Sequence, residues 1–276
     1  MPISRKRTDF TISRAALPGV EAVEARSDHV FARHSHDRHG VGLMLAGGQT
    51  SASGRGQVEA LAGNVITVNP GEVHDGAPVG GAPRAWRMLY LPAPLTAAAA
   101  ADLGEGAAGD YEFLHPVARD ARIAACFRRL YTAVTAGGGG GGDAAAMLRE
   151  QLLLALLNGL QARAPARRSA APSAGIARAR ALIDDAPAAP LALDDLARVG
   201  GLSRFQLVRQ FARATGLTPH AYILQRRIET VRALLARGTA LADAAAAGGF
   251  ADQSHMTRIF IRTYGITPGA YAAALA

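Results

Sequence analysis

Two kinds of hydrophobic pattern divide the chain at about residue 95. Before that point, short apolar runs such as VGLML, NVITVN and RAWRMLYL are separated by Gly, Pro, Asn and Asp. Apolar runs of this length between turn residues indicate β-strands. Several of them at a spacing of about ten residues predict a small β-barrel or sandwich.

Beyond that point the apolar residues recur with helical periodicity. The segments RIAACFRRLYTAV and AAMLREQLLLALLNGLQAR each predict a helix. The six glycines Gly137–Gly142 between them are typical of a flexible break, and a later stretch rich in Pro, Ala, Ser and Arg predicts a linker. The predicted organisation is a β-domain at 1–95, a helical connector at 96–164, a linker at 165–175 and an all-α domain at 176–276.

The segment Met147–Leu160 has leucines on nearly every face, so one neighbouring element cannot cover them all. Leu153, Leu154 and Leu157 form an arc beside the main apolar stripe. A monomer would bury this arc against its own β-domain, whereas a homodimer would bury it against the twin helix in a symmetric contact. We expect the homodimer.

The last hundred residues contain one pattern twice. The first copy is GGLSRFQLVRQFARATGLTPHAY and the second is GGFADQSHMTRIFIRTYGITPGAY. Each copy predicts a short helix, a glycine turn and a second helix, with Ser203 or Asp252 as N-cap and Gly216 or Gly265 as C-terminal stop. Two short helices joined by such a turn form a helix-turn-helix.

The second helix of the second copy is amphipathic. Met256, Ile259 and Phe260 fall on one apolar stripe. Amide, hydroxyl and guanidinium groups lie opposite, which are the groups that contact base edges and phosphates. A solvated helix face is the alternative, and the presence of an equivalent arginine in both copies argues against it.

The two copies are joined by a third predicted helix, Thr218–Gly238, with Pro219 at its first position. Its expected 21 residues would span roughly 30 Å. This length is close to the spacing of about 34 Å between successive major grooves on one side of DNA. A rigid helix of that length would hold two recognition helices in neighbouring grooves.

These residues resemble the AraC/XylS family of bacterial transcription regulators. The resemblance covers about a hundred residues and includes both modules, the connecting helix and both Thr-Pro boundaries in order. It implies that the base-reading positions are Arg204, Phe205, Val208, Arg209, Gln253, Ser254, Thr257 and Arg258. Phe205 and Val208 cannot form side-chain hydrogen bonds, so the first module is expected to read thymine methyl groups and DNA shape.

Three histidines in the first half are candidates for a binding site. His34 and His36 point to the same side of a strand, and His74 follows a Pro-Gly turn about forty residues later. This pattern resembles a cupin barrel, which in many regulators of this family is the effector-sensing domain. The positions where metal-binding cupins have a carboxylate are occupied here by Gly40 and Val41.

The histidines therefore leave three alternatives open. They line a polar effector pocket, they bind a divalent metal, or they are turn and surface residues. The expected effector-binding residues are His34, His36, Glu72, His74 and Trp86, and the metal candidates are the three histidines alone. We expect the effector pocket, with no metal and no cofactor. Trp86 and Tyr90 fall on the same side of their predicted strand, where they would form a wall of the pocket, and core packing is the alternative for both.

Charge, cysteine content and the motifs that are not evident narrow the possible classes of function. The formal net charge is +8, which favours an anionic partner, and the one cysteine, Cys126, excludes an internal disulfide framework. No signal peptide, membrane-spanning run or nucleotide-binding or hydrolase motif is evident. His39, His115 and His220 are expected at the surface or in loops, and Cys126 is expected to be buried and inert.

The expected fold is therefore multidomain α and β, with an N-terminal cupin-like β-barrel and an all-α C-terminal domain of two helix-turn-helix modules. The expected function is sequence-specific transcription regulation under the control of a small-molecule effector. The expected partners are double-stranded DNA, the effector and a second copy of the chain, with RNA polymerase a further candidate. We expect a bacterial cytoplasmic protein, bound to the nucleoid when on DNA, that is not an enzyme. The alternatives are an effector-independent DNA binder and a cupin metalloenzyme with an accessory DNA-binding domain.

Overall fold

A computed structural model describes residues 9–103, 111–136, 142–160 and 173–275. Backbone contacts divide the chain into two compact units, residues 1–30 with 35–164 and Phe31–His34 with 165–276. The short strand Phe31–His34 is hydrogen-bonded into a sheet of the first unit and is described with that sheet. Most of the glycine run and most of the expected linker lie outside the described residues.

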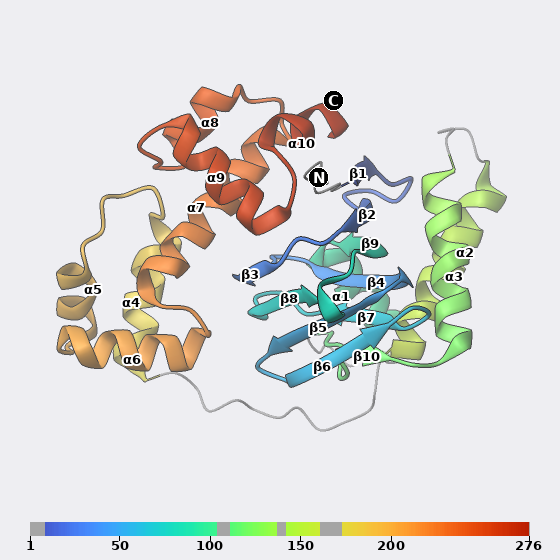
Figure 1. The fold of residues 1–276 in the computed structure, drawn as a ribbon, viewed down its shortest axis with the longest axis horizontal. Coiled ribbons are helices and arrows are strands. Elements are labelled where there is room, and N and C mark those ends of the chain that lie inside the picture. Colours follow the sequence, from blue (N-terminus) through green and yellow to red (C-terminus); the bar gives the residue numbers. More distant parts are fainter. Residues whose placement is uncertain (1–8, 104–110, 137–141, 161–172, 276) are drawn as a thin grey trace, which may run out of the picture. The chain divides into compact units, whose positions relative to one another are not determined.

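The described strands of the first unit form two β-sheets (Figure 1). Its strands are β1 (Asp9–Arg14), β2 (Glu21–Ser27), β3 (Phe31–His34), β4 (His39–Ala46), β5 (Gly48–Ser53), β6 (Gly56–Leu61), β7 (Val65–Val68), β8 (His74–Pro78), β9 (Arg84–Leu91) and β10 (Val117–Ala118). The sheet orders are β1-β2-β9-β4-β7-β10 and β3-β8-β5-β6. The expected cupin-like β-domain is confirmed, with its described strands in two sheets rather than in one closed barrel.

The helices in the described part of this unit are α1 (Ala93–Leu103), α2 (Ala121–Thr135) and α3 (Asp143–Leu160). Asp120 starts α2, because its carboxylate accepts a hydrogen bond of 2.7 Å from the backbone N–H of Arg122. Helices α2 and α3 lie side by side (Figure 1). Their apolar faces share one core with Val41 and Leu43 of β4. The run VGLML of β4 is buried up to Met44, whereas Leu45 is exposed, and it belongs to a strand in the interior of the six-stranded sheet.

The leucines of α3 are distributed differently from our expectation. Leu153 and Leu157 are 3% and 0% exposed and belong to the core of their own unit. The arc that we assigned to a partner helix is thus covered within the chain, so this part of the prediction was wrong. The apolar residues that α3 leaves exposed are Met147 and Leu148, near its N-terminus.

The second unit is helical (Figure 1). Its helices are α4 (Ala174–Asp185), α5 (Leu193–Gly200), α6 (Arg204–Thr215), α7 (Pro219–Leu235), α8 (Leu241–Ala247), α9 (Gln253–Tyr264) and α10 (Pro268–Leu275). Phe211 packs on Tyr222 with ring centroids 5.4 Å apart, and Phe260 packs on Tyr271 at 5.5 Å. In the part of the chain that the structure describes, every helix is too short or too polar to cross a membrane.

Candidate DNA interface and effector site

The first helix-turn-helix consists of α5, a glycine turn and α6. Gly201 ends α5 with a φ of 65°, a left-handed conformation that glycine adopts without steric cost. Ser203 then starts α6, because its hydroxyl accepts from the N–H of Gln206 and the Gln206 side chain accepts from the N–H of Ser203. The predicted cap and turn are confirmed at these residues.

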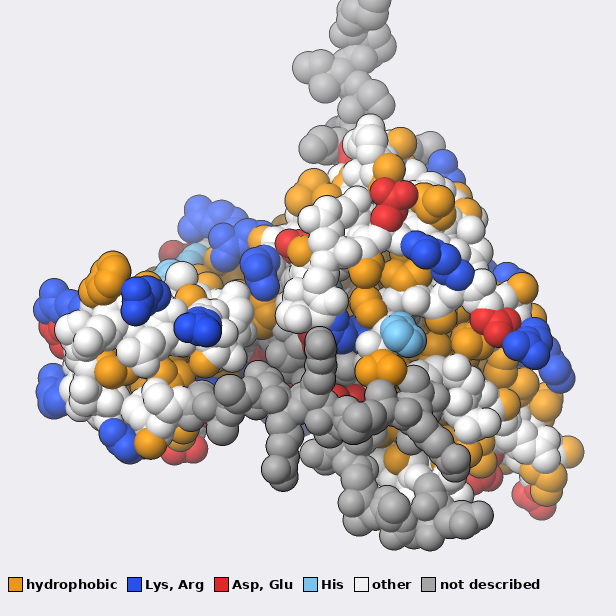
Figure 2. Space-filling model, turned by 90° about the horizontal axis from the view of Figure 1, so that it is seen from below, with side chains coloured by type: hydrophobic (Ala, Val, Ile, Leu, Met, Phe, Trp, Pro, Cys, Tyr) orange, Lys and Arg blue, Asp and Glu red, His pale blue; other side chains and the backbone are white. Residues whose placement is uncertain are grey.

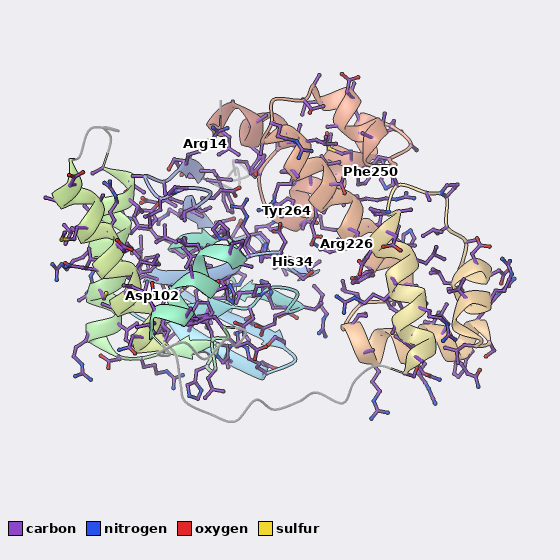
Figure 3. All side chains as sticks on the ribbon, turned by 180° about the vertical axis from the view of Figure 1, so that it is seen from behind. Arg14, His34, Asp102, Arg226, Phe250 and Tyr264 are labelled. Atoms are coloured by element: carbon purple, nitrogen blue, oxygen red, sulfur yellow. The ribbon has the colours of Figure 1, made fainter. Side chains whose placement is uncertain are left out.

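The second module repeats this local chemistry in α8 and α9. Asp252 accepts a hydrogen bond of 2.6 Å from the N–H of His255, and Gly265 ends α9 with a φ of 75°. Tyr264 lies at the end of α9 and Phe250 lies in the turn before it (Figure 3). Met256, Ile259 and Phe260 are buried, so the predicted apolar stripe faces the core.

The residues that we expect to contact DNA lie on the polar face of α6 and on the polar face of α9, in each case away from the buried apolar stripe. The side chains of Arg204, Phe205, Arg209, Gln253, Ser254 and Arg258 are exposed, whereas Val208 and Thr257 are half-buried. Phe205 is 74% exposed, which is unusual for a large apolar side chain. The guanidinium of Arg209 lies 5.9 Å from the centre of the Phe205 ring. Both helices therefore present polar groups beside a capped N-terminus.

Arg204 has a partner that the sequence did not suggest. Its guanidinium forms two hydrogen bonds with the carboxylate of Asp194, at the start of α5. The hydrogen bond from Arg204 holds the pKa of Asp194 below its ordinary value. Contact between Arg204 and a phosphate or a base requires this ion pair to open or to share its guanidinium.

Helix α7 connects the two modules and is shorter than predicted. It ends at Leu235, so it has 17 residues and not 21, and Gly238 follows in a left-handed turn. Its length is therefore roughly 25 Å. Arg227 on α7 donates hydrogen bonds to the carbonyl groups of Pro187, Ala189 and Gly249, which belong to the segments that precede α5 and α9.

Basic side chains are distributed over the second unit. Figure 2 shows one face of the molecule, on which arginine side chains are spread over the region of α4, α5 and α6 with fewer acidic groups between them. Arg226 of α7 is already engaged, because it pairs with Asp184 at 2.9 Å and with Glu229 at 2.5 Å (Figure 3). The charge available to an anionic partner therefore comes mainly from the exposed arginines of the two modules.

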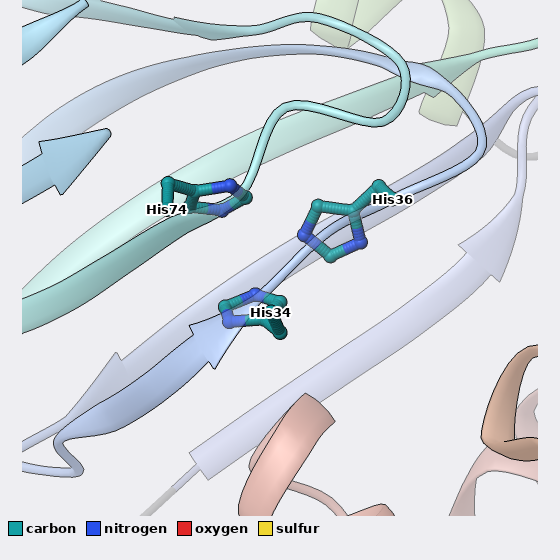
Figure 4. A group of neighbouring side chains, drawn as sticks. All are labelled: His34, His36 and His74. Atoms are coloured by element: carbon teal, nitrogen blue, oxygen red, sulfur yellow. The ribbon is translucent and has the colours of Figure 1, made fainter. Parts of the chain in front are cut away.

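The structure brings the three candidate histidines of the β-domain together (Figure 4). His34 ends β3, His36 follows two residues later and His74 begins β8, the neighbour of β3 in the four-stranded sheet. One possible ligand atom from each ring lies within 4.8 Å of the others. Burial lowers the pKa of His74, which favours the neutral ring at neutral pH.

Tyr90, one of the two aromatic residues considered as a wall of the pocket, contacts this cluster. The ring centroids of Tyr90 and His36 are 5.0 Å apart. Tyr90 pairs with Gly40 in the register of β9 and β4, and a Cβ on Gly40 would meet the Tyr90 ring at 3.4 Å. The same Cβ would lie nearer to the end of the Met88 side chain, at 3.0 Å, so Gly40 is closely surrounded on this face of the sheet.

Glu72 has a different neighbour from the one expected. Its carboxylate accepts a hydrogen bond of 2.7 Å from Arg55 and a second of 3.1 Å from the N–H of Asn69. Burial is the largest single influence and favours a raised pKa. The hydrogen bonds from Arg55, Ser53 and the N–H of Asn69, together with the charge of Arg55, outweigh it, so the pKa of Glu72 lies below its ordinary value. Its backbone carbonyl accepts a hydrogen bond from His74 Nδ1 at 3.0 Å.

Trp86 is 6% exposed and packs between two other side chains. The ring of Phe10 meets it edge-on at 5.7 Å, and the guanidinium of Arg84 lies 4.9 Å from its centre. These contacts resemble the core packing that we considered as the alternative for this residue.

His39 is not at the surface, so that expectation was wrong. It is 4% exposed, and its Nε2 lies 2.8 Å from the Tyr111 carbonyl while its Nδ1 lies 2.9 Å from the Thr96 hydroxyl. The Tyr111 hydroxyl in turn donates to the Leu157 carbonyl of α3. Burial lowers the pKa of His39. His115 and His220 are exposed, as expected.

Cys126 lies half-buried on α2, with its thiol 3.5 Å from the Leu152 carbonyl. Burial raises the pKa of the thiol, which disfavours the reactive thiolate.

A β-domain followed by two helix-turn-helix modules is the architecture of a two-domain DNA-binding protein. A model of the AraC-like ligand binding domain matches residues 17–157, about half of the chain, and a model of a helix-turn-helix domain matches residues 196–274. The chain belongs to the AraC family, with an N-terminal ligand-binding domain and a C-terminal helix-turn-helix domain.

Curated relatives resemble only part of the chain. It is 42% identical over 64 residues to the uncharacterized HTH-type transcriptional regulator YbfI of Bacillus subtilis (strain 168), which covers 23% of each protein. It is 37% identical over 84 residues to the transcriptional activator NphR of Rhodococcus sp, covering 30% of this chain and 25% of that protein. The matched part thus spans about a quarter of the length of these relatives.

The fold as a whole is similar to that of ToxT from Vibrio cholerae O395. The TM-score is 0.57, and the comparison covers 98% of both chains with 11% sequence identity. The likeness concerns the fold alone, because so little of the sequence is shared.

Proposed function

We propose that the protein is a transcription regulator that binds double-stranded DNA through α6 and α9. The observation that carries this proposal is the repetition of one capped, amphipathic helix with an exposed polar face in both modules. Recognition helices of helix-turn-helix proteins place their N-terminal residues in the major groove. The exposed arginines, the amide and the hydroxyl groups have the donor and acceptor chemistry that such contacts need.

The two modules would read DNA by different chemistry. In α9, Gln253, Ser254 and Arg258 offer hydrogen bonds to base edges, and a bidentate arginine suits guanine. In α6, Phe205 and the half-buried Val208 would contact thymine methyl groups, while Arg209 would contact a base or a phosphate. The second module would therefore account for most of the hydrogen-bonded base readout.

We assign control of this regulator to a small molecule bound in the N-terminal domain. The match to an AraC-like ligand binding domain supports this role. The cluster of His34, His36 and His74 beside Tyr90 is the proposed location, since it combines buried imidazoles with an aromatic wall. Glu72 and Trp86 would act on the pocket indirectly, the former by holding Arg55 and the latter by packing.

Action as a homodimer would suit the arrangement of half-sites that a regulator reads. The exposed Met147 and Leu148 of α3, which are 59% and 42% exposed, are the proposed contact. Two linked DNA-binding units gain affinity through effective concentration. A cytoplasmic location and contact with RNA polymerase when bound upstream of a promoter belong to the same proposal.

A genome-wide footprint of the full chain tests whether the protein binds specific DNA sites under the control of a small molecule. We expect discrete bound sites that shift or change occupancy with one class of added metabolite. The binding constant measured on such a site should fall steeply with salt, because phosphate contacts release counterions. Uniform occupancy of the genome, with or without metabolites, would contradict sequence-specific regulation.

A further inference from the structure

The histidine cluster has a property that an effector pocket does not require. Three imidazoles from the end of β3, the loop after it and the start of β8 converge so that one ligand atom of each lies within 4.8 Å of the others. His34 and His36 are 6% and 8% exposed. The rings of His36 and His74 are 5.2 Å apart between centroids (Figure 4).

Hydrogen bonds to the backbone orient two of these rings. His34 Nδ1 lies 2.7 Å from the Ala32 carbonyl, and His74 Nδ1 lies 3.0 Å from the Glu72 carbonyl. A carbonyl oxygen can only accept, so Nδ1 carries a proton in both rings, and in the neutral form of each ring the lone pair is on Nε2. Histidines that bind metals have the same arrangement, in which a backbone carbonyl accepts from the ring nitrogen that does not bind the metal.

We propose that His34, His36 and His74 bind one divalent transition-metal ion of the zinc type. Imidazole nitrogens suit zinc, cobalt, nickel and copper, whereas magnesium and calcium prefer oxygen ligands. Zinc–nitrogen bonds of about 2.0–2.1 Å place tetrahedral ligand atoms about 3.4 Å apart. Small rotations of the rings would close the present separation, which is at most 4.8 Å.

Three protein ligands leave one position of a tetrahedral ion open. Among the described residues, the ligand group contains the three histidines and no carboxylate, so the donor set is neutral. The ion would keep both positive charges and would favour water or an anionic oxygen donor in the open position. This defines a chemical class of effector, a small molecule with a carboxylate or a similar group. The proposal of a metal site is based on the three converging histidines and does not depend on the proposed function in transcription regulation.

The test uses the full chain without a polyhistidine tag. The protein is stripped with a chelator and titrated with Co²⁺, with visible absorption and metal analysis as readouts. We expect one Co²⁺ per chain, intense bands typical of a tetrahedral ion, and displacement by Zn²⁺. His36→Gln and His74→Gln should weaken Co²⁺ binding at least about tenfold, because each removes a ligand. His115→Ala is the matched control, since this histidine is exposed in the same unit, and it should bind as the wild type does.

Two outcomes would overturn the metal site. One is a wild-type chain that binds less than a tenth of an equivalent of Co²⁺, and the other is unchanged binding in a folded His34→Gln/His36→Gln/His74→Gln variant. Far-ultraviolet circular dichroism of the stripped proteins establishes folding, and the wild-type titration decides the matter where a variant fails to fold. DNA binding is measured on the same samples, with a footprinted site, to separate the metal proposal from the proposed function. Loss of metal binding with intact DNA binding would overturn the metal site and would not affect the proposal that the protein is a DNA-binding regulator.

Discussion

The guanidinium of Arg204, the first residue of α6, is held by the carboxylate of Asp194, near the start of α5. The ion pair ties the proposed recognition helix to the helix before it. Both side chains are well exposed, so the pair has little influence on folding. Its importance lies in the position of Arg204 at the end of the helix that would enter the groove.

Asp194→Asn should therefore strengthen DNA binding severalfold. The substitution releases Arg204 and removes a negative charge near the phosphates, so the slope of log affinity against log salt should steepen by up to about 0.9. Fluorescence anisotropy with a labelled site measures both quantities. Adding Arg204→Ala should cancel the gain, and a gain that persists in the double variant would show that Arg204 is not the group released.

Arg258→Ala should weaken binding to a specific site by about 1–3 kcal/mol and relax base preference at one position. The reason is that an exposed arginine on the polar face of α9 is suited to bidentate contact with guanine. Binding to a set of single-base variants of the site measures the preference. Arg128→Ala on α2 removes the same charge from the other unit and should leave the preference unchanged. Equal effects of the two substitutions would reduce the role of Arg258 to net charge.

Arg227→Met should destabilise the helical unit by about 2–3 kcal/mol, because it leaves three half-buried carbonyl groups without their donor. Arg227→Lys should recover only part of this loss, since one ammonium cannot reproduce the planar fork of a guanidinium. Urea unfolding followed by circular dichroism at 222 nm compares the three proteins. Equal stability of the wild type and Arg227→Met would mean that water replaces the guanidinium without cost.

Stability should fall as the pH is lowered below about 6.5, the ordinary pKa of histidine, and His39 should contribute to this fall. Burial lowers the pKa of His39 in the folded chain, so the unfolded chain binds the proton first as the pH falls. The loss continues until the pH reaches the folded pKa. Urea midpoints at pH 7.5, 6.5 and 5.5 measure the slope. His39→Gln should flatten it, and an unchanged slope would assign the effect to other groups such as His74, whose pKa burial also lowers.

Light scattering at micromolar concentration should give about twice the chain mass, and Met147→Glu with Leu148→Glu should give one chain mass. These side chains are exposed on α3, so the change places charge in the proposed contact without entering the core. Leu114→Glu, at another exposed apolar residue of the same unit, is the matched control and should leave the mass doubled. A wild-type chain that remains monomeric on DNA as well would remove the dimer from the proposal.

The two helix-turn-helix modules were predictable because their signals are local. Ser203 and its partner Gln206 are three residues apart, as are Asp252 and His255. Burial of Met256 and Phe260 follows from helical spacing within one helix. Such interactions depend on a few neighbouring residues, so a sequence pattern contains almost everything that determines them.

Only the tertiary structure decided which distant residues meet. His39 is buried because its partners, Thr96 and Tyr111, lie 57 and 72 residues further along the chain. Leu153 and Leu157 are covered by their own unit, although their helical pattern fits a partner helix equally well. Strand order and helix docking decide such contacts.

The family, the two proposed recognition helices and the three candidate histidines were predictable from the sequence, because each depends on residue type and short spacing. The tertiary structure decided that the histidines converge, that Glu72 binds Arg55 and that Asp194 holds Arg204. The pairing of β3 with β8 places His34 beside His74, forty residues away in the sequence. A strand pairing is set by the packing of the whole sheet, and no local pattern around either histidine specifies it.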